Sequence, residues 1–333
     1  MKIAYLGAGT WGTALALLLV DNKHELKVWD VNSELLDILD KTRKHPKLPG
    51  IAIPKSLKYV RTIEEAIDDA ELIIESVTSA GIRPVLNTLK KLKGDKLPAF
   101  VFTSKGIEQK TGLLFPEVAL EVLGEHMKDR IGCISGPSHA EEVVKKLPTS
   151  LVGTSYDRDL MMQIVGLFNT PYFRVYPNSD IHGVAFGGAL KNVIAIACAI
   201  SDGLGYGENA KAALLTRGLH EMRKLSKFKG CNPDTLNGLA GLGDVFVTCV
   251  STLSRNYQFG RLMAQGYSIE EARDKIGMVV EGVYSCVSAM HLAEKYNVAM
   301  PITELIYKIL YKNFNAREAV LSLLQRQIKD EHL

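Results

Sequence analysis

The sequence has few cysteines and little excess charge of either sign. Five cysteines occur in 333 residues, an odd number without a CxxC pair, which indicates reduced thiols rather than a disulfide framework. The formal net charge is only +3, and no basic tract is dense enough to indicate a nucleic-acid partner. The eight histidines form no HxxxH or HExxH motif, so we expect no metal site.

From the sequence we also expect neither a leader nor a membrane segment. It enters an expected strand at Lys2, which leaves no room for a signal peptide. No apolar run looks long enough to span a bilayer, so we expect no stable membrane span and a cytoplasmic protein. The proportions of apolar (47%) and charged (23%) residues are those of a globular protein, and the length allows two domains.

The most informative pattern that is present occupies the first twelve residues. The apolar run Lys2–Leu6 leads into Gly7-Ala8-Gly9-Thr10-Trp11-Gly12, and Thr10–Val20 is expected to form an apolar helix. This order is typical of a dinucleotide-binding turn: Gly7 permits the turn, Gly9 admits a pyrophosphate, and Gly12 lets the helix pack on the strand. The N-terminus of the helix would offer N–H groups to the phosphates. The alternative is an ordinary strand–helix turn.

Asp30 ends a second expected strand, Leu26–Trp29, and lies 23 residues after Gly7. A carboxylate at this distance can accept hydrogen bonds from the ribose hydroxyls of NAD and would repel the 2′-phosphate of NADP. The alternative is that Asp30 only caps the helix that begins near Ser33, although Ser33 could serve as that cap itself.

The pattern of the chain changes near residue 178. Before it, strand and helix patterns alternate, which predicts an α/β fold with a Rossmann-type, doubly wound and mostly parallel sheet over residues 1–178. After it, apolar residues recur at helical spacing, which predicts an all-helical domain over residues 179–333. Further strands are expected at Leu72–Ser76, Ala99–Thr103, Ile131–Ser135, Ser150–Gly153 and Phe173–Val175. Further helices are expected at Ser33–Asp40, Thr62–Asp69, Ile82–Leu92 and Pro137–Lys145.

Lys191 is the most unusual residue of the helical half. With Asn192 it provides the only polar side chains in Gly183–Ile200, and Gly187 and Gly188 nearby would let a ligand approach. Burial disfavours the charged form of a lysine and brings its pKa toward the range useful for proton transfer. The alternative is a lysine whose ammonium group reaches water at the edge of the helix.

Two segments that follow strands also carry polar groups. Lys105 follows the strand Ala99–Thr103, and the carboxyl ends of parallel strands are where ligands bind in such sheets. Gly136, Pro137 and Ser138 follow the strand Ile131–Ser135 and suggest a helix start that could hold an anion. A surface lysine and a plain helix cap are the respective alternatives.

A third cluster lies in the helical half. The glycine-rich run Gly238–Gly243 precedes Asp244, and Thr248 lies four positions further, on the same helical face. Ser254-Arg255-Asn256 follows, and arginine suits bidentate phosphate binding. Each residue alone could be a cap or a surface residue. Together with the two lysines they predict a site for a small phosphorylated carbonyl compound.

The motifs also resemble a known family. GAGTWGTALA, SKGIE, ISGPSHAEE, GALKNVIAIA, NGLAGLGDVFVTC, SRNYQFG and VVEGV occur in the order found in NAD(P)-dependent glycerol-3-phosphate dehydrogenase. The resemblance spans residues 1 to about 310. It implies a Rossmann domain followed by a helical domain, reversible reduction of dihydroxyacetone phosphate to sn-glycerol 3-phosphate, and a supply of phospholipid precursors.

The resemblance also implies roles for individual residues. Lys191 would donate and accept the proton, and Lys105 would contact both substrate and cofactor. Substrate would be bound by these lysines and by Gly136, Ser138, Asp244, Thr248, Ser254, Arg255 and Asn256. The dinucleotide would be bound by Gly7, Gly9, Thr10, Trp11, Gly12, Asp30, Lys105, Ala140, Arg255, Val279 and Glu281. Many bacterial relatives carry arginines where this chain has Asp30-Val31-Asn32, and this departure favours NAD over NADP.

The expected chemistry needs no metal, because a lysine ammonium can stabilise the developing negative charge on a carbonyl oxygen. Two other classes of protein remain open from the residues. One is a two-domain dehydrogenase acting on a 2-hydroxy acid or ketopantoate-like substrate, and the other is a nicotinamide-sensing binding protein. The sequence leaves the oligomeric state undetermined and is compatible with a homodimer.

Overall fold

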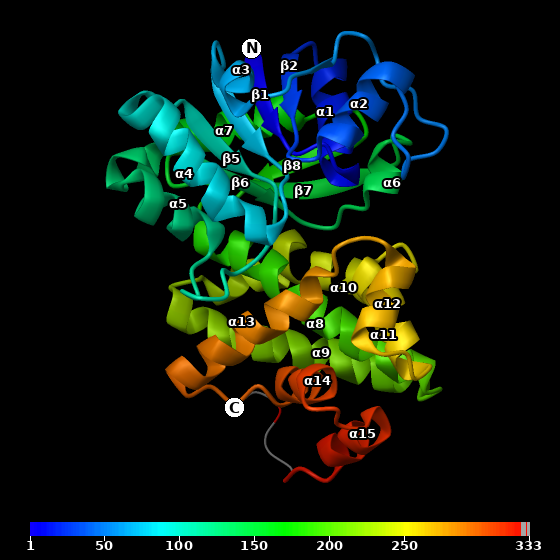
Figure 1. The fold of residues 1–333 in the computed structure, drawn as a ribbon. Helices are drawn as coiled ribbons and strands as arrows, with labels where there is room; N and C mark the ends of the chain where they lie inside the picture. The colour runs from blue at the N-terminus through cyan, green and yellow to red at the C-terminus, as the bar shows by residue number, and fades with distance from the viewer. Residues whose placement is uncertain (328–330, 332–333) are drawn as a thin grey trace. The chain divides into compact units, whose positions relative to one another are not determined.

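The computed structural model describes residues 1–327 and 331. Contacts within the chain divide it into two compact units (Figure 1). The first comprises Met1–Ala189 and Lys229–Asp244, and the second comprises Leu190–Phe228 and Val245–Leu333. The domain boundary expected at residues 178 and 179 stays a prediction.

The first unit is built on a sheet whose order, in the described chain, is β3-β2-β1-β4-β5-β6-β7-β8. Its strands are β1 (Lys2–Leu6), β2 (Glu25–Trp29), β3 (Lys58–Tyr59), β4 (Leu72–Glu75), β5 (Ala99–Phe102), β6 (Ile131–Ser135), β7 (Thr149–Ser155) and β8 (Phe173–Pro177). Neighbouring strands run parallel except β6 and β7, which are antiparallel. This arrangement confirms the doubly wound, mostly parallel sheet.

Helices cover both faces of this sheet, as the alternating pattern predicts. In the first unit they are α1 (Thr10–Asp21), α2 (Ser33–Thr42), α3 (Ile63–Ile67), α4 (Ile82–Lys93), α5 (Phe115–Leu123), α6 (Ala140–Val143) and α7 (Arg158–Phe168). Side chains of β1 alternate between the two cores: Ile3 and Tyr5 pack in one, and Ala4 and Leu6 in the other. A strand buried on both faces therefore appears in the sequence as a continuous apolar run.

The outer strand β8 is held by side chains of the turn that precedes it. The N–H of Phe173 donates to Thr170 Oγ1 at 2.9 Å, and the N–H of Val175 donates to Asn169 Oδ1 at 2.9 Å. Pro177 ends the strand and has no N–H group.

Helices make up the regular structure of the second unit, and no strand follows β8 within residues 178–327. They are α8 (Ile181–Gly203), which begins in the first unit, α9 (Gly207–Ser226), α10 (Asp244–Val250), α11 (Arg255–Ala264), α12 (Ile269–Ile276), α13 (Glu281–Tyr296), α14 (Pro301–Tyr311) and α15 (Ala316–Leu324). The first turn of α14 is capped from another helix, because Glu221 of α9 accepts the N–H groups of Ile302 (2.6 Å) and Thr303 (3.2 Å).

One expectation about membranes needs correction. Helix α8 has 23 residues and a mean hydropathy of 1.7, so by length and composition it could cross a bilayer. Within the structure 89% of this apolar stretch is buried, which is the behaviour of a core helix.

The structure differs from the predicted elements in two places. It contains a strand that the sequence does not predict, β3, whose two residues, Lys58 and Tyr59, are too few to show a pattern. The helix expected at Pro137–Lys145 is only α6, because Ser138 turns its hydroxyl back to the carbonyl of Gly136 at 2.9 Å and the helix begins at Ala140.

Candidate active site

The glycine turn between β1 and α1 has the geometry that the fingerprint requires. Gly7 has a φ of +110°, and a Cβ there would lie 2.6 Å from the carbonyl oxygen of Ser76. A Cβ on Gly12 would lie 2.1 Å from the carbonyl oxygen of Gly7, so helix and turn touch backbone to backbone. Gly9 caps α1 and has no atom within 4 Å of a Cβ position, which leaves open space at the helix N-terminus. Thr10 and Trp11 begin α1.

Asp30 joins the end of β2 to this turn. Its Oδ2 accepts the N–H of Ala8 at 2.6 Å, and its Oδ1 accepts the N–H of Asn32 at 2.8 Å. The cap of α2 is Asn32, whose side chain accepts the N–H of Leu35 at 3.0 Å. The alternative in which Asp30 or Ser33 caps this helix is therefore wrong.

Glu75, at the end of β4, is a buried acid that no sequence motif singles out. It is fully buried, and it accepts the N–H groups of Val77 (3.0 Å), Thr103 (3.1 Å) and Ser104 (3.1 Å). Burial raises the pKa of Glu75 to about 7, against the opposing effect of these donors. Glu75 thus ties the end of β4 to the segment that leads to Lys105. Its one signal in the sequence is a carboxylate at the end of an apolar run.

Lys105 extends from this segment into a largely buried position. Its ammonium group donates to Asp244 Oδ2 at 2.6 Å and to the carbonyl of Gly136 at 2.9 Å. Asp244 is fully buried, and the side chain of Lys105 is 15% exposed. A Cβ on Gly188 of α8 would lie 2.6 Å from Ser135 Oγ and 2.9 Å from Lys105 Cδ, so the glycine leaves room for both side chains. The structure therefore brings together Lys105, Gly136 and Asp244 and excludes the alternative of a surface lysine.

Gly136 and Ala140 both lie in the segment that follows β6. Gly136 has a φ of +144°, and a Cβ there would lie 2.8 Å from Leu151 Cδ2. Ala140 is buried in the same core as Leu15 of α1, so α6 packs beside the helix of the glycine turn.

In the second unit, hydrogen bonds of Asn256 connect several of the predicted site residues. Asn256 donates from Nδ2 to Asn192 Oδ1 at 2.9 Å, and its Oδ1 accepts the N–H of Gly282 at 2.8 Å. These bonds hold the N-termini of α11 and α13 against the middle of α8. Lys191, beside Asn192, is half-buried, as is Glu281, beside Gly282. Asn192 is thus a supporting residue, whereas in the sequence it stands out only as a polar side chain in an apolar helix.

The remaining predicted residues of this unit lie near those helix starts or on α10. Arg255 begins α11, and its Nη1 donates to the carbonyl of Val279 at 3.4 Å. Ser254 is buried and caps α11 by accepting the N–H of Tyr257 at 3.2 Å. Thr248 is buried on α10. Arg255 and Val279, both expected to contact the dinucleotide, are therefore neighbours.

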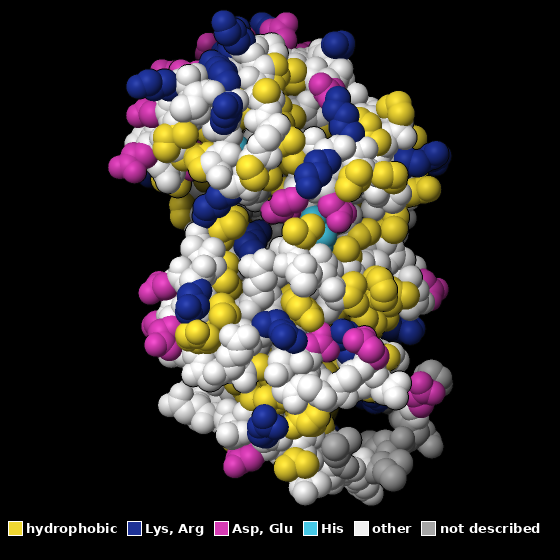
Figure 2. Space-filling model, turned by 90° about the vertical axis from the view of Figure 1, so that its right-hand side faces the viewer, with side chains coloured by type: hydrophobic (Ala, Val, Ile, Leu, Met, Phe, Trp, Pro, Cys, Tyr) yellow, Lys and Arg dark blue, Asp and Glu magenta, His cyan; other side chains and the backbone are white. Residues whose placement is uncertain are grey.

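Other kinds of site have requirements with which the described residues can be compared. On the face shown in Figure 2, Lys and Arg side chains are spread among acidic and apolar ones. Within residues 1–327 and 331, no group of three or more His, Cys, Asp or Glu side chains gathers to hold a metal ion. The five cysteines are all buried.

A doubly wound sheet, a glycine turn opening α1 and an acidic residue at the end of β2 define the class of protein: a Rossmann-fold oxidoreductase with a helical second half. Family profiles narrow the class. The profile of the NAD-dependent glycerol-3-phosphate dehydrogenase N-terminus matches residues 2–161, and that of the C-terminus matches residues 180–321. The chain belongs to the NAD-dependent glycerol-3-phosphate dehydrogenase family.

Individual relatives agree along the whole chain. It is 53% identical over 332 residues to glycerol-3-phosphate dehydrogenase [NAD(P)+] of Protochlamydia amoebophila, covering 100% of this chain and 99% of the relative. It is 54% identical to the enzyme of that name from Chlamydia trachomatis serovar L2b, covering 99% of each. The crystal structure of glycerol-3-phosphate dehydrogenase from Coxiella burnetii superposes with a TM-score of 0.93 at 36% identity, covering 98% of this chain and 99% of that one. The 2-hydroxy acid, ketopantoate and sensor alternatives are therefore set aside.

Proposed function

We propose that this chain reversibly reduces dihydroxyacetone phosphate to sn-glycerol 3-phosphate with NAD(H) or NADP(H). The observation that carries the proposal is the identity of more than half of its residues, over its full length, to a glycerol-3-phosphate dehydrogenase. The product is a precursor of glycerophospholipids, so the proposed role is to supply phospholipid synthesis. The buried thiols fit a cytoplasmic protein.

The first unit fits a dinucleotide. Gly9 faces open space at the N-terminus of α1, where backbone N–H groups suit a pyrophosphate, and Gly7, Thr10, Trp11 and Gly12 shape that turn. Asp30 keeps carboxylate lone pairs beyond the two N–H groups it accepts, and these can take up ribose hydroxyls. When bound, the nicotinamide ring supplies or accepts the hydride. Lys105, Ala140, Arg255, Val279 and Glu281 are the proposed further contacts.

The substrate is assigned to a further set of the predicted residues. Arg255 offers a planar donor pair for the phosphate. Asn256, held by Asn192 and Gly282, is presented in one orientation. The remaining proposed contacts are Gly136, Ser138, Asp244, Thr248 and Ser254.

Two lysines have distinct proposed roles. The ammonium of Lys105 has a further N–H donor besides those bound by Asp244 and Gly136, and it can direct that donor to a substrate oxygen. Asp244 orients Lys105 through their contact of 2.6 Å. Lys191 is the proposed proton donor to the carbonyl oxygen during reduction and the acceptor during oxidation.

The test is an absorbance assay at the NADH band. Purified protein is mixed with dihydroxyacetone phosphate and either NADH or NADPH, and sn-glycerol 3-phosphate is identified as the product. Oxidation of reduced cofactor that depends on dihydroxyacetone phosphate supports the proposal. Its absence with both cofactors, in protein whose fold is verified, overturns it. Sedimentation of the same sample tests whether the chain forms a homodimer.

A further inference from the structure

The loop that carries Lys105 is closed on itself shortly after that residue. Ile107 forms an antiparallel bridge with Leu114. The N–H of Glu108 donates to the carbonyl of Leu113 at 2.9 Å, and the carbonyl of Glu108 accepts the N–H of Gly112 at 2.8 Å. Glu108 therefore lies where the loop returns, three residues after Lys105.

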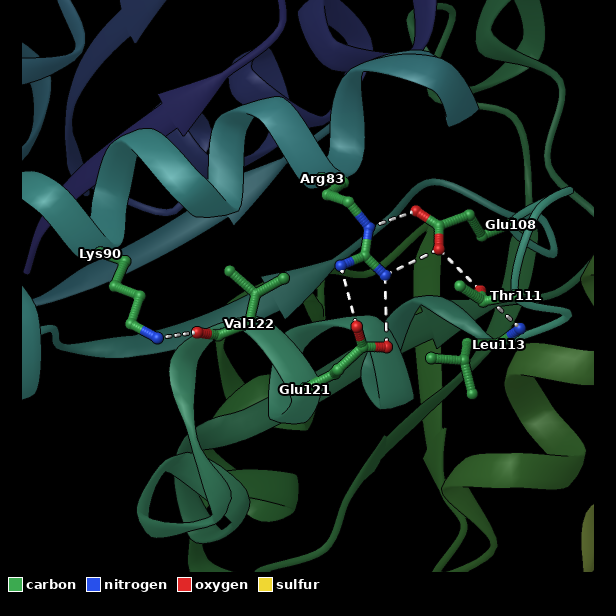
Figure 3. Close-up of polar contacts among 7 residues, drawn as sticks. All are labelled: Arg83, Lys90, Glu108, Thr111, Leu113, Glu121 and Val122. Carbon is green, nitrogen blue, oxygen red and sulfur yellow. Dashed lines mark hydrogen bonds and ion pairs between the residues drawn. The ribbon is translucent and has the colours of Figure 1, made fainter.

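Arg83 of α4 holds the side chain of Glu108 (Figure 3). Its Nε donates to Glu108 Oε1 at 2.7 Å and its Nη2 donates to Oε2 at 2.7 Å, a bidentate pair. The same guanidinium donates to Glu121 of α5 at 3.1 and 3.3 Å. Thr111 donates to Glu108 Oε2 at 2.6 Å, so the carboxylate also binds the far side of its own loop.

This contact differs from an ordinary surface ion pair, which contributes little to stability. Both side chains are more than two-thirds shielded, since Arg83 is 29% and Glu108 is 20% exposed. Hydrogen bonding to Arg83 lowers the pKa of Glu108, which keeps the carboxylate charged. One guanidinium thereby joins α4, α5 and the loop through two carboxylates.

The segment before Lys105 is anchored as well, because Glu75 accepts the N–H groups of Thr103 and Ser104. Gly106 packs against α5, where a Cβ would lie 2.6 Å from the ring of Phe115. The backbone is therefore held on both sides of Lys105, and the pairing of Arg83 with Glu108 is the side-chain ion pair that holds the loop after it.

We propose that Arg83 is a positioning residue for the reaction: by holding Glu108 it fixes the loop from which Lys105 reaches Asp244 and Gly136. This inference rests on the proposed function. A misplacement of about 1 Å in a catalytic group can cost roughly a hundredfold in rate, so an anchor outside the site can influence turnover.

Helix α4 also offers a matched control. Lys90 lies on the same helix and donates to the carbonyl of Val122 at the end of α5 at 2.6 Å (Figure 3), and neither residue belongs to the Lys105 loop. Arg83→Met and Lys90→Met each remove one cation and one bridge between α4 and α5. Arg83→Met alone releases Glu108.

The experiment compares wild type, Arg83→Met, Arg83→Lys and Lys90→Met in the dihydroxyacetone phosphate assay, with melting temperature as the check on folding. We expect Arg83→Met to lower kcat/KM about tenfold or more, Arg83→Lys to recover part of it, and Lys90→Met to stay within about twofold of wild type. An equal decrease in kcat/KM in Arg83→Met and Lys90→Met would overturn the proposal.

A Lys105→Met background separates positioning from a general loss of structure. If Arg83 acts through Lys105, adding Arg83→Met to Lys105→Met leaves the residual kcat/KM unchanged. If the second substitution costs the same factor in both backgrounds, Arg83 acts otherwise and the proposal is wrong. An inactive wild type would instead contradict the proposed function.

Discussion

Lys105 and Asp244 form an ion pair of 2.6 Å across a sequence separation of 139 residues, and the aspartate is fully buried. Removing one member of a buried pair leaves the other charge without compensation, which costs about 3–5 kcal/mol. We therefore expect Asp244→Ala to destabilise the protein by that amount. The double variant Lys105→Met with Asp244→Ala should lose less free energy of unfolding than the two single variants lose in sum. Urea unfolding of all four proteins measures this, and additive losses would show that the two residues are energetically independent.

Substrate choice should depend on the phosphate. If Arg255 binds it, the wild type should turn over dihydroxyacetone phosphate but hardly any unphosphorylated dihydroxyacetone. Arg255→Ala should mainly raise KM for the phosphorylated substrate, because it removes binding rather than proton transfer. Steady-state kinetics on both ketones measure this, and equal activity of the wild type on both would remove the case for a phosphate site.

The role assigned to Lys191 predicts a different kinetic change. Loss of a proton donor should lower kcat by roughly 10²–10⁴ in Lys191→Ala, not only weaken substrate binding. Circular dichroism verifies the fold of the variant. A kcat near that of the wild type in folded Lys191→Ala protein would assign the proton to another group.

Cofactor preference should be set at Asp30. Its charge opposes a 2′-phosphate, so we expect kcat/KM to favour NADH over NADPH by about tenfold or more, which is about 1.4 kcal/mol. Asp30→Ala should shrink the ratio, but it also removes the acceptor of the Ala8 N–H. Asp30→Asn is the sharper variant, since an amide can still accept that bond while the charge is lost. Preference of the wild type for NADPH, or an unchanged ratio in both variants, would mean that Asp30 is not the selector.

The contribution of Glu75 and Glu221 to stability should fall as pH rises from acid to neutral. Burial raises the pKa of both Glu75 and Glu221 from 4.5 to about 7, so the folded chain binds more protons than the unfolded chain between these values. The stabilisation is complete below about pH 4.5 and is lost as pH rises through about 7. Glu221→Gln, which can still accept an N–H at α14, should flatten part of this dependence. Urea unfolding at pH 5 and pH 8 gives the change in free energy of unfolding between these pH values for wild type and Glu221→Gln. Equal changes in the two proteins would contradict the contribution assigned to Glu221.

The extent to which sequence predicts this structure differs among its elements. The predicted strands lie within about two residues of the observed ones, because buried parallel strands form continuous apolar runs. The predicted helix is longer than α6 because Pro137 and Ser138 resemble a helix start in the sequence. In the structure the hydroxyl of Ser138 donates to the carbonyl of Gly136, and the helix begins only at Ala140.

Contacts between site residues that are far apart in the sequence are harder to predict than the helices and strands. Lys105 and Asp244 are each conspicuous in the sequence, but nothing in their spacing reveals that they pair. Glu75 and Arg83 resemble an ordinary strand end and a surface arginine until their partners, 28 and 25 positions further, are known. Partner choice at such separations depends on how the chain packs, which local patterns do not encode.

The hydrogen bonds along β8 limit the addition of a strand from another copy of this chain to the edge of the sheet. An exposed strand edge normally invites another strand to add to the sheet. Here the N–H groups of Phe173 and Val175 are already occupied by Thr170 and Asn169, and Pro177 has none to offer. At the opposite edge β3 has only two residues, too few to template a partner strand. Strand addition is therefore disfavoured at both edges, which guards against fibril-like growth.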